Sequence, residues 1–383
     1  MSHVRIVPVA ILLAGGLLLT ACSSSSSSSG TTPSGSTTAG GGDAAGVAAA
    51  TQYLQTYIAN PTSIVLTTPV SKAPPKGKFI IKLTTPEPVS TVISNNAADA
   101  ATALGWTFKS LMIGATADGP AKAFDAALQM KPDGIIISGD PKSTYSVQLA
   151  AAKAAGIPVV SESTTDVGGT GDGIIANPDG PGQVAAWGKL VAAGIVVDSG
   201  GTADVLSVNI PAYPILNVYA GALKAALAEW APNAKVTDLN VQATDIGTKV
   251  GPAIVSAMQA DPNINYASFS FGDLSIGVPA ALSAAGLNVK IVGETPSPAN
   301  IQGLKDGTQT MWPGFSAPIL GWRDIDALVR FYTGDNPAAA GLIALPTQVL
   351  NKTTVGGAVL NGDGFYVGVN GYQAQFKKLW MSN

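Results

Sequence analysis

The chain of 383 residues has very little histidine, cysteine or arginine. Its one histidine is His3 and its one cysteine is Cys22. Beyond residue 22 there is therefore no residue for Ser-His-Asp or Cys-His catalysis, for a histidine or cysteine zinc site, or for a disulfide. Carboxylate chemistry, such as that of a glycosidase pair, and an oxygen-ligand calcium site are not excluded by this composition.

Positive charge is also scarce. Of the 21 Lys and Arg residues, Arg5 stands near the start, so 20 remain in the rest of the chain against 24 Asp and Glu. A mildly acidic chain with no basic block excludes nucleic acid as a partner. Arg323 and Arg330 are the only arginines after Arg5, which makes a bidentate clamp for carboxylate or phosphate hard to build. Because Asp326 and Arg330 are four residues apart, we expect a helix with a solvated charged face there.

The first 42 residues have the composition of a leader followed by a tether. Ile6 to Leu19 is an apolar run too short to span a membrane comfortably, and it is followed closely by Cys22. The tetrapeptide LTAC resembles the lipobox of bacterial lipoproteins, in which the chain is cut before the cysteine, which then carries lipid. We expect a signal peptide over 1–21, a lipidated Cys22 and a flexible Ser- and Gly-rich tether over 22–42. An ordinary secretory signal with an incidental cysteine is the alternative.

From residue 43 onward the pattern predicts an α/β body, preceded by a helix over 43–60 and a proline-broken connector up to residue 76. Apolar stretches such as FIIKL and GIIIS are typical of strands in a parallel sheet that helices cover on both faces. The expected strands are 79–83, 107–113, 134–138, 157–160, 204–208, 235–241, 266–271, 289–292 and 345–350. The expected helices are 92–104, 120–130, 145–155, 182–193, 215–230, 248–260, 274–285 and a short one before residue 380.

The body contains an internal sequence repeat. KPDGIIISGD is followed by a helix that ends in AAKAAGIPVVSES, and DPNINYASFSFGD is followed by a helix that ends in ALSAAGLNVKIVGET. Both copies run strand, Gly-Asp, helix, Ala-Ala-Gly and strand, and then reach a glutamate, Glu162 in one and Glu294 in the other. The repeat indicates two lobes of similar construction.

These motifs and the later GLKDGTQTMW, taken in order, resemble the type I periplasmic binding proteins over about residues 77–336. The nearest branch is the ribose-type sugar receptors of ABC transporters. The resemblance implies an α/β fold of two doubly wound Rossmann-like lobes joined by a three-stranded hinge. It assigns 77–180 plus 313–336 to the N-terminal lobe and 181–312 plus 337–383 to the C-terminal lobe. We expect a monomer with no cofactor and no metal.

In that family the ligand lies between the lobes, near the carboxyl ends of the strands, as open α/β sheets also favour. The resemblance implies ligand contacts at fourteen positions: Glu87, Val89, Ser90, Asp140, Glu162, Asn177, Tyr213, Asn217, Phe271, Asp273, Glu294, Thr295, Trp312 and Phe315. The four aromatic side chains suit stacking on a sugar face or on an aromatic or alicyclic ligand, with hinge or core packing as the alternative. The carboxylates accept hydrogen bonds from hydroxyls or pair with a cationic ligand, with a solvated loop position as the alternative. The arginine that sugar receptors commonly place near Glu162 or Asn217 is missing.

The function that the resemblance implies is capture of a small molecule outside the membrane. The protein, anchored by lipid on Cys22, closes around the ligand and delivers it to an ABC permease without catalysis. One alternative is a sensor that passes lobe closure to a membrane signalling partner. Another is a carboxylate-only glycosidase that uses Glu87, Glu162 or Asp273. A transcription regulator with the same lobes is excluded, because a leader stands where its helix-turn-helix would be.

Overall fold

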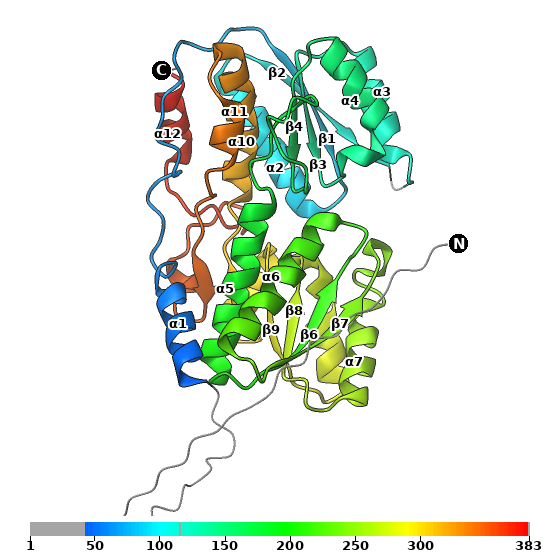
Figure 1. The fold of residues 1–383 in the computed structure, drawn as a ribbon, viewed down its shortest axis with the longest axis vertical. Helices are drawn as coiled ribbons and strands as arrows, with labels where there is room; N and C mark the ends of the chain where they lie inside the picture. The colour runs from blue at the N-terminus through cyan, green and yellow to red at the C-terminus, as the bar shows by residue number, and fades with distance from the viewer. Residues whose placement is uncertain (1–42, 115, 382–383) are drawn as a thin grey trace, which may run out of the picture. The chain divides into compact units, whose positions relative to one another are not determined.

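The computed structural model describes residues 43–114 and 116–381 (Figure 1). The expected signal peptide, the tether and Cys22 lie outside these residues. Within the described part of the chain, no helix combines the length and the apolar character that crossing a membrane requires.

The described strands form two sheets, each with a doubly wound order. Sheet A has the order β2-β1-β3-β4-β5, with every pair parallel. Sheet B has the order β11-β10-β9-β8-β6-β7, and only its β10–β11 pair is antiparallel. The strands of sheet A are β1 Phe79–Thr84, β2 Thr107–Met112, β3 Gly134–Ser138, β4 Val159–Glu162 and β5 Ile174–Ala176. The strands of sheet B are β6 Asp204–Asn209, β7 Lys235–Asn240, β8 Tyr266–Phe269, β9 Lys290–Gly293, β10 Met311–Pro313 and β11 Val349–Asn351.

Helices cover both faces of the central strands, as their apolar sequences require. The helices are α1 Ala44–Gln55, α2 Pro88–Ala103, α3 Gly119–Gln129, α4 Ser146–Ala154, α5 Pro181–Ser199, α6 Pro214–Trp230, α7 Val250–Ala260, α8 Val278–Ala284, α9 Pro298–Asp306, α10 Ala317–Thr333, α11 Pro337–Gly341 and α12 Tyr372–Leu379. In the fully buried β3, Ile136 joins the core that contains residues of α2 and α10, whereas Ile135 and Ile137 join the core of α3 and α4. The edge strand β2 has no fully buried residue, which agrees with its mixed polar sequence.

Four helices differ from their expected bounds by four residues or more. Helix α1 ends at Gln55 instead of residue 60, and α5 continues to Ser199 instead of residue 193. The other two, α2 and α8, differ for local reasons. Helix α2 starts at Pro88, four residues before the expected start, because proline suits the first helical position and Glu87 takes the N-cap. The helix expected over 274–285 is interrupted at Gly277, whose φ of 78° lies in the left-handed region. A 3₁₀ turn at Gly272–Ser275 therefore precedes a shorter α8.

Three segments connect the two sheets and form the hinge: residues 177–180, 314–316 and 342–348. Sheet A with α2 and α10 makes the first lobe, and sheet B with α5 and α6 makes the second (Figure 1). Helix α1 packs against α5 and α6, whereas α11 and α12 pack against α10. The exact lobe boundaries stay a prediction, and the contacts of α11 and α12 favour the first lobe over the expected second.

The crossing of α10 over α2 is too close for a side chain at Gly321. A Cβ atom there would lie 2.3 Å from the carbonyl oxygen of Ile93 and 2.7 Å from the amide nitrogen of Ala97. We expect Gly321→Ala to lower the free energy of unfolding by about 2–3 kcal/mol in urea denaturation. Gly221→Ala in α6 is the matched control, because that position is open, and we expect it to raise stability by about 0.5–1 kcal/mol. Equal effects at the two sites would contradict the close contact of α2 and α10.

Candidate functional site

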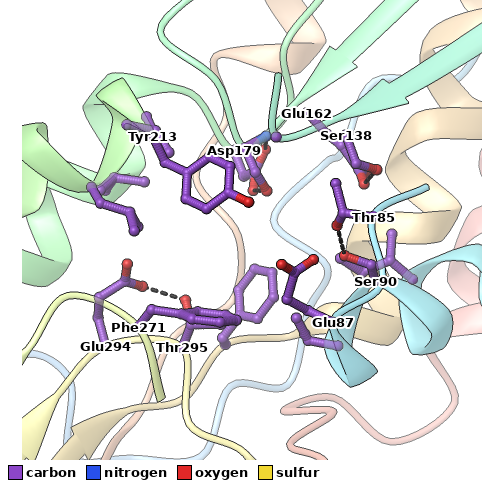
Figure 2. A pocket seen from close by; sticks show the side chains of 18 of the residues that line it. Thr85, Glu87, Ser90, Ser138, Glu162, Asp179, Tyr213, Phe271, Glu294 and Thr295 are labelled. Carbon is purple, nitrogen blue, oxygen red and sulfur yellow. Dashed lines mark hydrogen bonds between the residues drawn. The ribbon is translucent and has the colours of Figure 1, made fainter. Parts of the chain in front are cut away.

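A cavity lies where the carboxyl ends of the strands of both sheets face each other (Figure 2). Such strand ends are where loops and helix N-termini meet a ligand in open α/β sheets. The first lobe and its hinge segment contribute Thr85, Glu87, Val89, Ser90, Ile93, Ser138, Gly139, Glu162, Ser163 and Asp179. The second lobe and the remaining hinge contribute Val184, Trp187, Tyr213, Ile215, Leu216, Phe271, Glu294, Thr295 and Phe315.

The two glutamates that end the sequence repeats, Glu162 and Glu294, lie at equivalent places in the two walls. Glu162 ends β4 and Glu294 follows β9, and both side chains are buried. The next residue in each case has a left-handed backbone, with φ of 53° at Ser163 and 52° at Thr295. Non-glycine residues rarely adopt this conformation, and where they do they cluster at ligand sites. The turn aims each neighbouring hydroxyl at a carboxylate, since Ser163 Oγ donates to Asp179 at 2.6 Å and Thr295 Oγ1 donates to Glu294.

A buried charge triad supports the first wall. The side chains of Lys82, Glu162 and Asp324 are fully buried, and Lys82 Nζ donates to Glu162 and, at 3.4 Å, to Asp324. Burial alone would raise the pKa of Glu162, but the charge of Lys82 and hydrogen bonds from Lys82 and Ser138 hold it below its ordinary value. Burial and then the charge of Glu162 raise the pKa of Asp324 well above its ordinary value. These directions favour a triad in which Lys82 and Glu162 are charged and Asp324 holds a proton.

Four carboxyl groups in or beside the cavity have raised pKa values. Burial raises the pKa of Glu294 to about 8. Burial and then the charge of Glu162 raise the pKa of Asp179 to about 6. Burial and then the charge of Glu87 raise the pKa values of Asp140 and Asp273 to about 6 as well. The described residues that line the cavity include no lysine, arginine or histidine, so the site offers many hydrogen-bond acceptors and no cation.

Aromatic faces complete the cavity. Tyr213 and Phe271 are half-buried in its wall, and Phe315 meets Trp187 edge to face with ring centroids 5.3 Å apart. Aromatic rings of this kind bind the apolar faces of sugars and other rings. The combination of ring faces with hydroxyl and carboxylate oxygens suits a small ligand that carries both apolar faces and hydrogen-bond donors.

Nine of the fourteen predicted site residues line this cavity and five do not. The nine are Glu87, Val89, Ser90, Glu162, Tyr213, Phe271, Glu294, Thr295 and Phe315. Asp140 and Asp273 lie next to it, close enough to respond to Glu87. Whether any of the fourteen contacts a ligand stays a prediction.

Three predicted residues serve the framework. The side-chain amide of Asn177 donates to the carbonyl oxygens of Thr164 and Asp166 in the loop between β4 and β5. Asn217 is exposed and braces the loop before α6 through Asn209 and Pro211. Trp312 is fully buried in the core and donates to Gln309.

Sequence reasoning missed several lining residues, above all Trp187 and Val184 of α5. Both lie in the first two turns of a helix that directly follows a hinge segment. A helix start at that place was the signal that could have found them, because such a start faces the cleft. Across the described residues, no group of three histidine, cysteine or acidic side chains is arranged to hold a metal ion.

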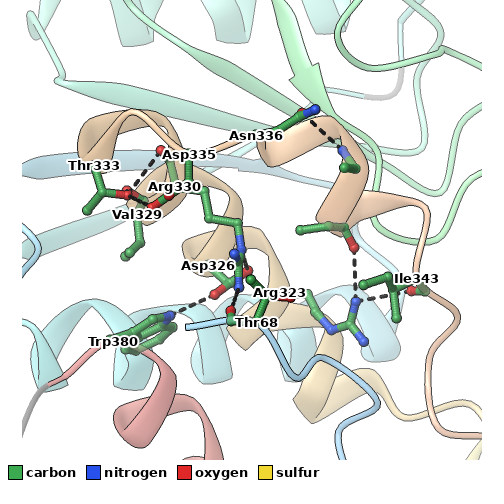
Figure 3. Close-up of polar contacts among 12 residues, drawn as sticks. Thr68, Arg323, Asp326, Val329, Arg330, Thr333, Asp335, Asn336, Ile343 and Trp380 are labelled. Atoms are coloured by element: carbon green, nitrogen blue, oxygen red, sulfur yellow. Dashed lines mark hydrogen bonds and ion pairs between the residues drawn. The ribbon is translucent and has the colours of Figure 1, made fainter. Parts of the chain in front are cut away.

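The helix α10 corrects a prediction, since it is buried rather than solvated (Figure 3). Arg323 is 2% exposed and donates to the carbonyl oxygens of Ile64, Ala340, Ile343 and Ala344. Arg330 pairs with Asp326 at 2.7 Å and also donates to the carbonyl oxygen of Thr68. The solvated-face prediction was wrong because the segment before β1, α11 and α12 cover the helix. Both arginines are thereby kept out of the cavity.

The comparisons with known proteins agree with this architecture. The family model described as a periplasmic binding protein domain matches residues 79–336. The chain therefore belongs to the periplasmic binding protein family. No match was found among curated proteins.

Solved structures share the fold at low sequence identity. An ABC sugar transporter subunit from Rhodobacter sphaeroides is 18% identical, with a TM-score of 0.64 over 73% of this chain and 99% of its own. A solute-binding protein from Agrobacterium vitis with bound allitol is 21% identical, with a TM-score of 0.64 over 74% and 98%. A carbohydrate transporter protein from Acidothermus cellulolyticus in complex with myo-inositol is 21% identical, with a TM-score of 0.62 over 73% and 96%.

Proposed function

We propose that this protein is the solute-binding component of an ABC transporter and captures a sugar or sugar-like molecule between its two lobes. The observation that carries the proposal is the cavity at the carboxyl ends of both sheets, which combines aromatic faces with hydroxyl and carboxylate oxygens. Sugars and polyols present ring or chain faces together with many hydroxyl donors. Related folds hold allitol and myo-inositol, which supports the same ligand class here.

Binding is expected to act through lobe closure. A ligand that contacts both walls favours the state in which they are close, by the difference between its affinities for the open and closed states. The hinge segments 177–180, 314–316 and 342–348 would absorb the change of angle. The closed protein then presents its outer surface to the permease, and no residue needs to make or break a bond. A lipid anchor on Cys22 would keep the protein at the membrane.

Thermal unfolding tests this function. The purified protein is heated with pentoses, hexoses, linear polyols, cyclitols and, for contrast, aromatic acids. A ligand at a hundred times its Kd is expected to stabilise the folded state by about 2.7 kcal/mol. A shift with a sugar or polyol supports the proposal, and shifts confined to aromatic acids would replace it with another ligand class.

Phe271 is expected to be a principal ring contact. Phe271→Ala should weaken binding of the sugar found in that screen at least tenfold, about 1.4 kcal/mol, because a ring face is lost from the wall. Calorimetric titration measures the affinity. The matched control is Phe331→Ala on α10, an exposed phenylalanine outside the cavity, which should leave the affinity unchanged. Equal affinities for the two variants would contradict the assigned role.

A further inference from the structure

The ionisable side chains that line the cavity are acidic. Glu87, Glu162, Asp179 and Glu294 lie in its wall, with no lysine, arginine or histidine among the described lining residues. Glu87 also lies near enough to Asp140, outside the lining, for its charge to act on that carboxyl group. A closed cleft with this wall would bring several carboxyl groups together away from water.

The nearby Lys82 does not supply a free positive charge to this wall. Its ammonium group is fully buried and is shared by Glu162 and Asp324, so its charge is already matched. The hydrogen bonds that the other buried carboxyl groups of this wall accept come from neutral donors. Glu294 accepts from the hydroxyl of Thr295, and Asp179 accepts from the amide and hydroxyl of Ser163.

No cation stabilises the ionised forms of these buried carboxyl groups, and closure around a neutral ligand would leave them without one. A protonated amine supplies three N–H donors and the missing positive charge at once. We infer that the cleft takes a ligand that carries a protonated amine, namely an amine-bearing sugar or cyclitol. This inference rests on the proposed function, because it names the ligand class for the same cleft.

Glu294 is the position expected to meet the amine. It is 2% exposed, yet it lies in the cavity wall on the second lobe. The titratable groups that face it are Asp179 on the hinge and Tyr219 on α6, and neither is a cation. The half-buried rings of Tyr213 and Phe271 in the same wall also favour a cation, through their negative faces (Figure 2).

Matched pairs of ligands test the inference on the unaltered protein. Calorimetric titration compares D-glucosamine with D-glucose, D-galactosamine with D-galactose, and an aminocyclitol with myo-inositol. In at least one pair the amine is expected to bind at least tenfold more tightly, about 1.4 kcal/mol. For the sugar amines, N-acetylation removes the charge and should abolish this advantage.

Variants then locate the amine. Glu294→Gln keeps the shape of the side chain and should lower the affinity for the amine at least tenfold more than it lowers the affinity for the neutral partner. Asp179→Asn is a second variant with the same expected direction. Glu229→Gln on α6, where the side chain is 60% exposed, is the control and should change neither affinity.

The outcomes separate this inference from the proposed function. Neutral sugars that bind as tightly as their amines would overturn the inference and leave the proposed function standing. A preference for the amine that persists in both Glu294→Gln and Asp179→Asn would also overturn it. If no amine, sugar or polyol binds at all, both the inference and the proposed function fail.

Discussion

Replacing Lys82 by methionine is expected to lower the free energy of unfolding by about 3–5 kcal/mol, because it leaves a buried carboxylate without its cation. Lys82 lies in the middle of β1, and its side chain is fully buried between Glu162 and Asp324. Methionine fills a similar volume, so packing changes little. The loss of unfolding free energy therefore measures the effect of removing the positive charge. Urea denaturation followed by circular dichroism measures the effect.

A second variant separates charge from packing. Adding Glu162→Gln and Asp324→Asn to Lys82→Met removes the buried carboxylate that has lost its cation. This triple variant is expected to recover most of the lost stability. Lys122→Met is the surface control, since Lys122 is 71% exposed, and should change stability by less than about 0.5 kcal/mol. A loss below about 1 kcal/mol for Lys82→Met would show that the triad is not a buried ionic unit.

The second large effect is a fall in stability between about pH 4.5 and pH 8. The folded-state pKa of Glu294 is about 8 against an ordinary value of 4.5. The folded protein therefore keeps a proton that the unfolded chain has released, and stability falls as the pH rises through this window. The full shift of Glu294 corresponds to a fall on the order of 5 kcal/mol. Asp140, Asp179 and Asp273, with pKa values of about 6, add a fall of the same sign below about pH 6.

Urea unfolding of Glu294→Gln at pH 5, 6.5 and 8 measures this contribution. The variant is expected to show a much shallower decline than the unaltered protein, because glutamine has no proton to lose. Glu229→Gln, an exposed change of the same kind, should keep the original decline. Parallel curves for Glu294→Gln and the unaltered protein would mean that this carboxyl group is ionised in the folded state at neutral pH.

The fold could be predicted from the sequence because its signals are local. Apolar strands such as GIIIS alternate with helices, and the resulting two-lobed α/β architecture is confirmed. The internal repeat also indicated that Glu162 and Glu294 are equivalent, and both lie at equivalent strand ends. The order of the elements along the chain and the positions of the strand ends were therefore enough to predict where the cavity lies.

The partners of individual side chains could not be predicted, because they come from distant parts of the chain. Arg323 donates to Ile64, which is separated from it by 259 positions. Lys82 stands in the apolar strand FIIKL, and only α10 supplies its second partner, Asp324. Trp312 was expected in the cavity but is buried in the core, whereas Trp187, for which no role was predicted, lines the cavity. The sequence does not say which face of a strand or helix reaches the cavity.

The central claim is that a small ligand binds between the lobes. A crystal structure of the protein with the ligand from the thermal screen tests it most directly. The account predicts the ligand between Phe271 and Glu294 on one side and Glu162 and Ser90 on the other. A ligand found outside this cavity, with the cleft filled only by water, would contradict it.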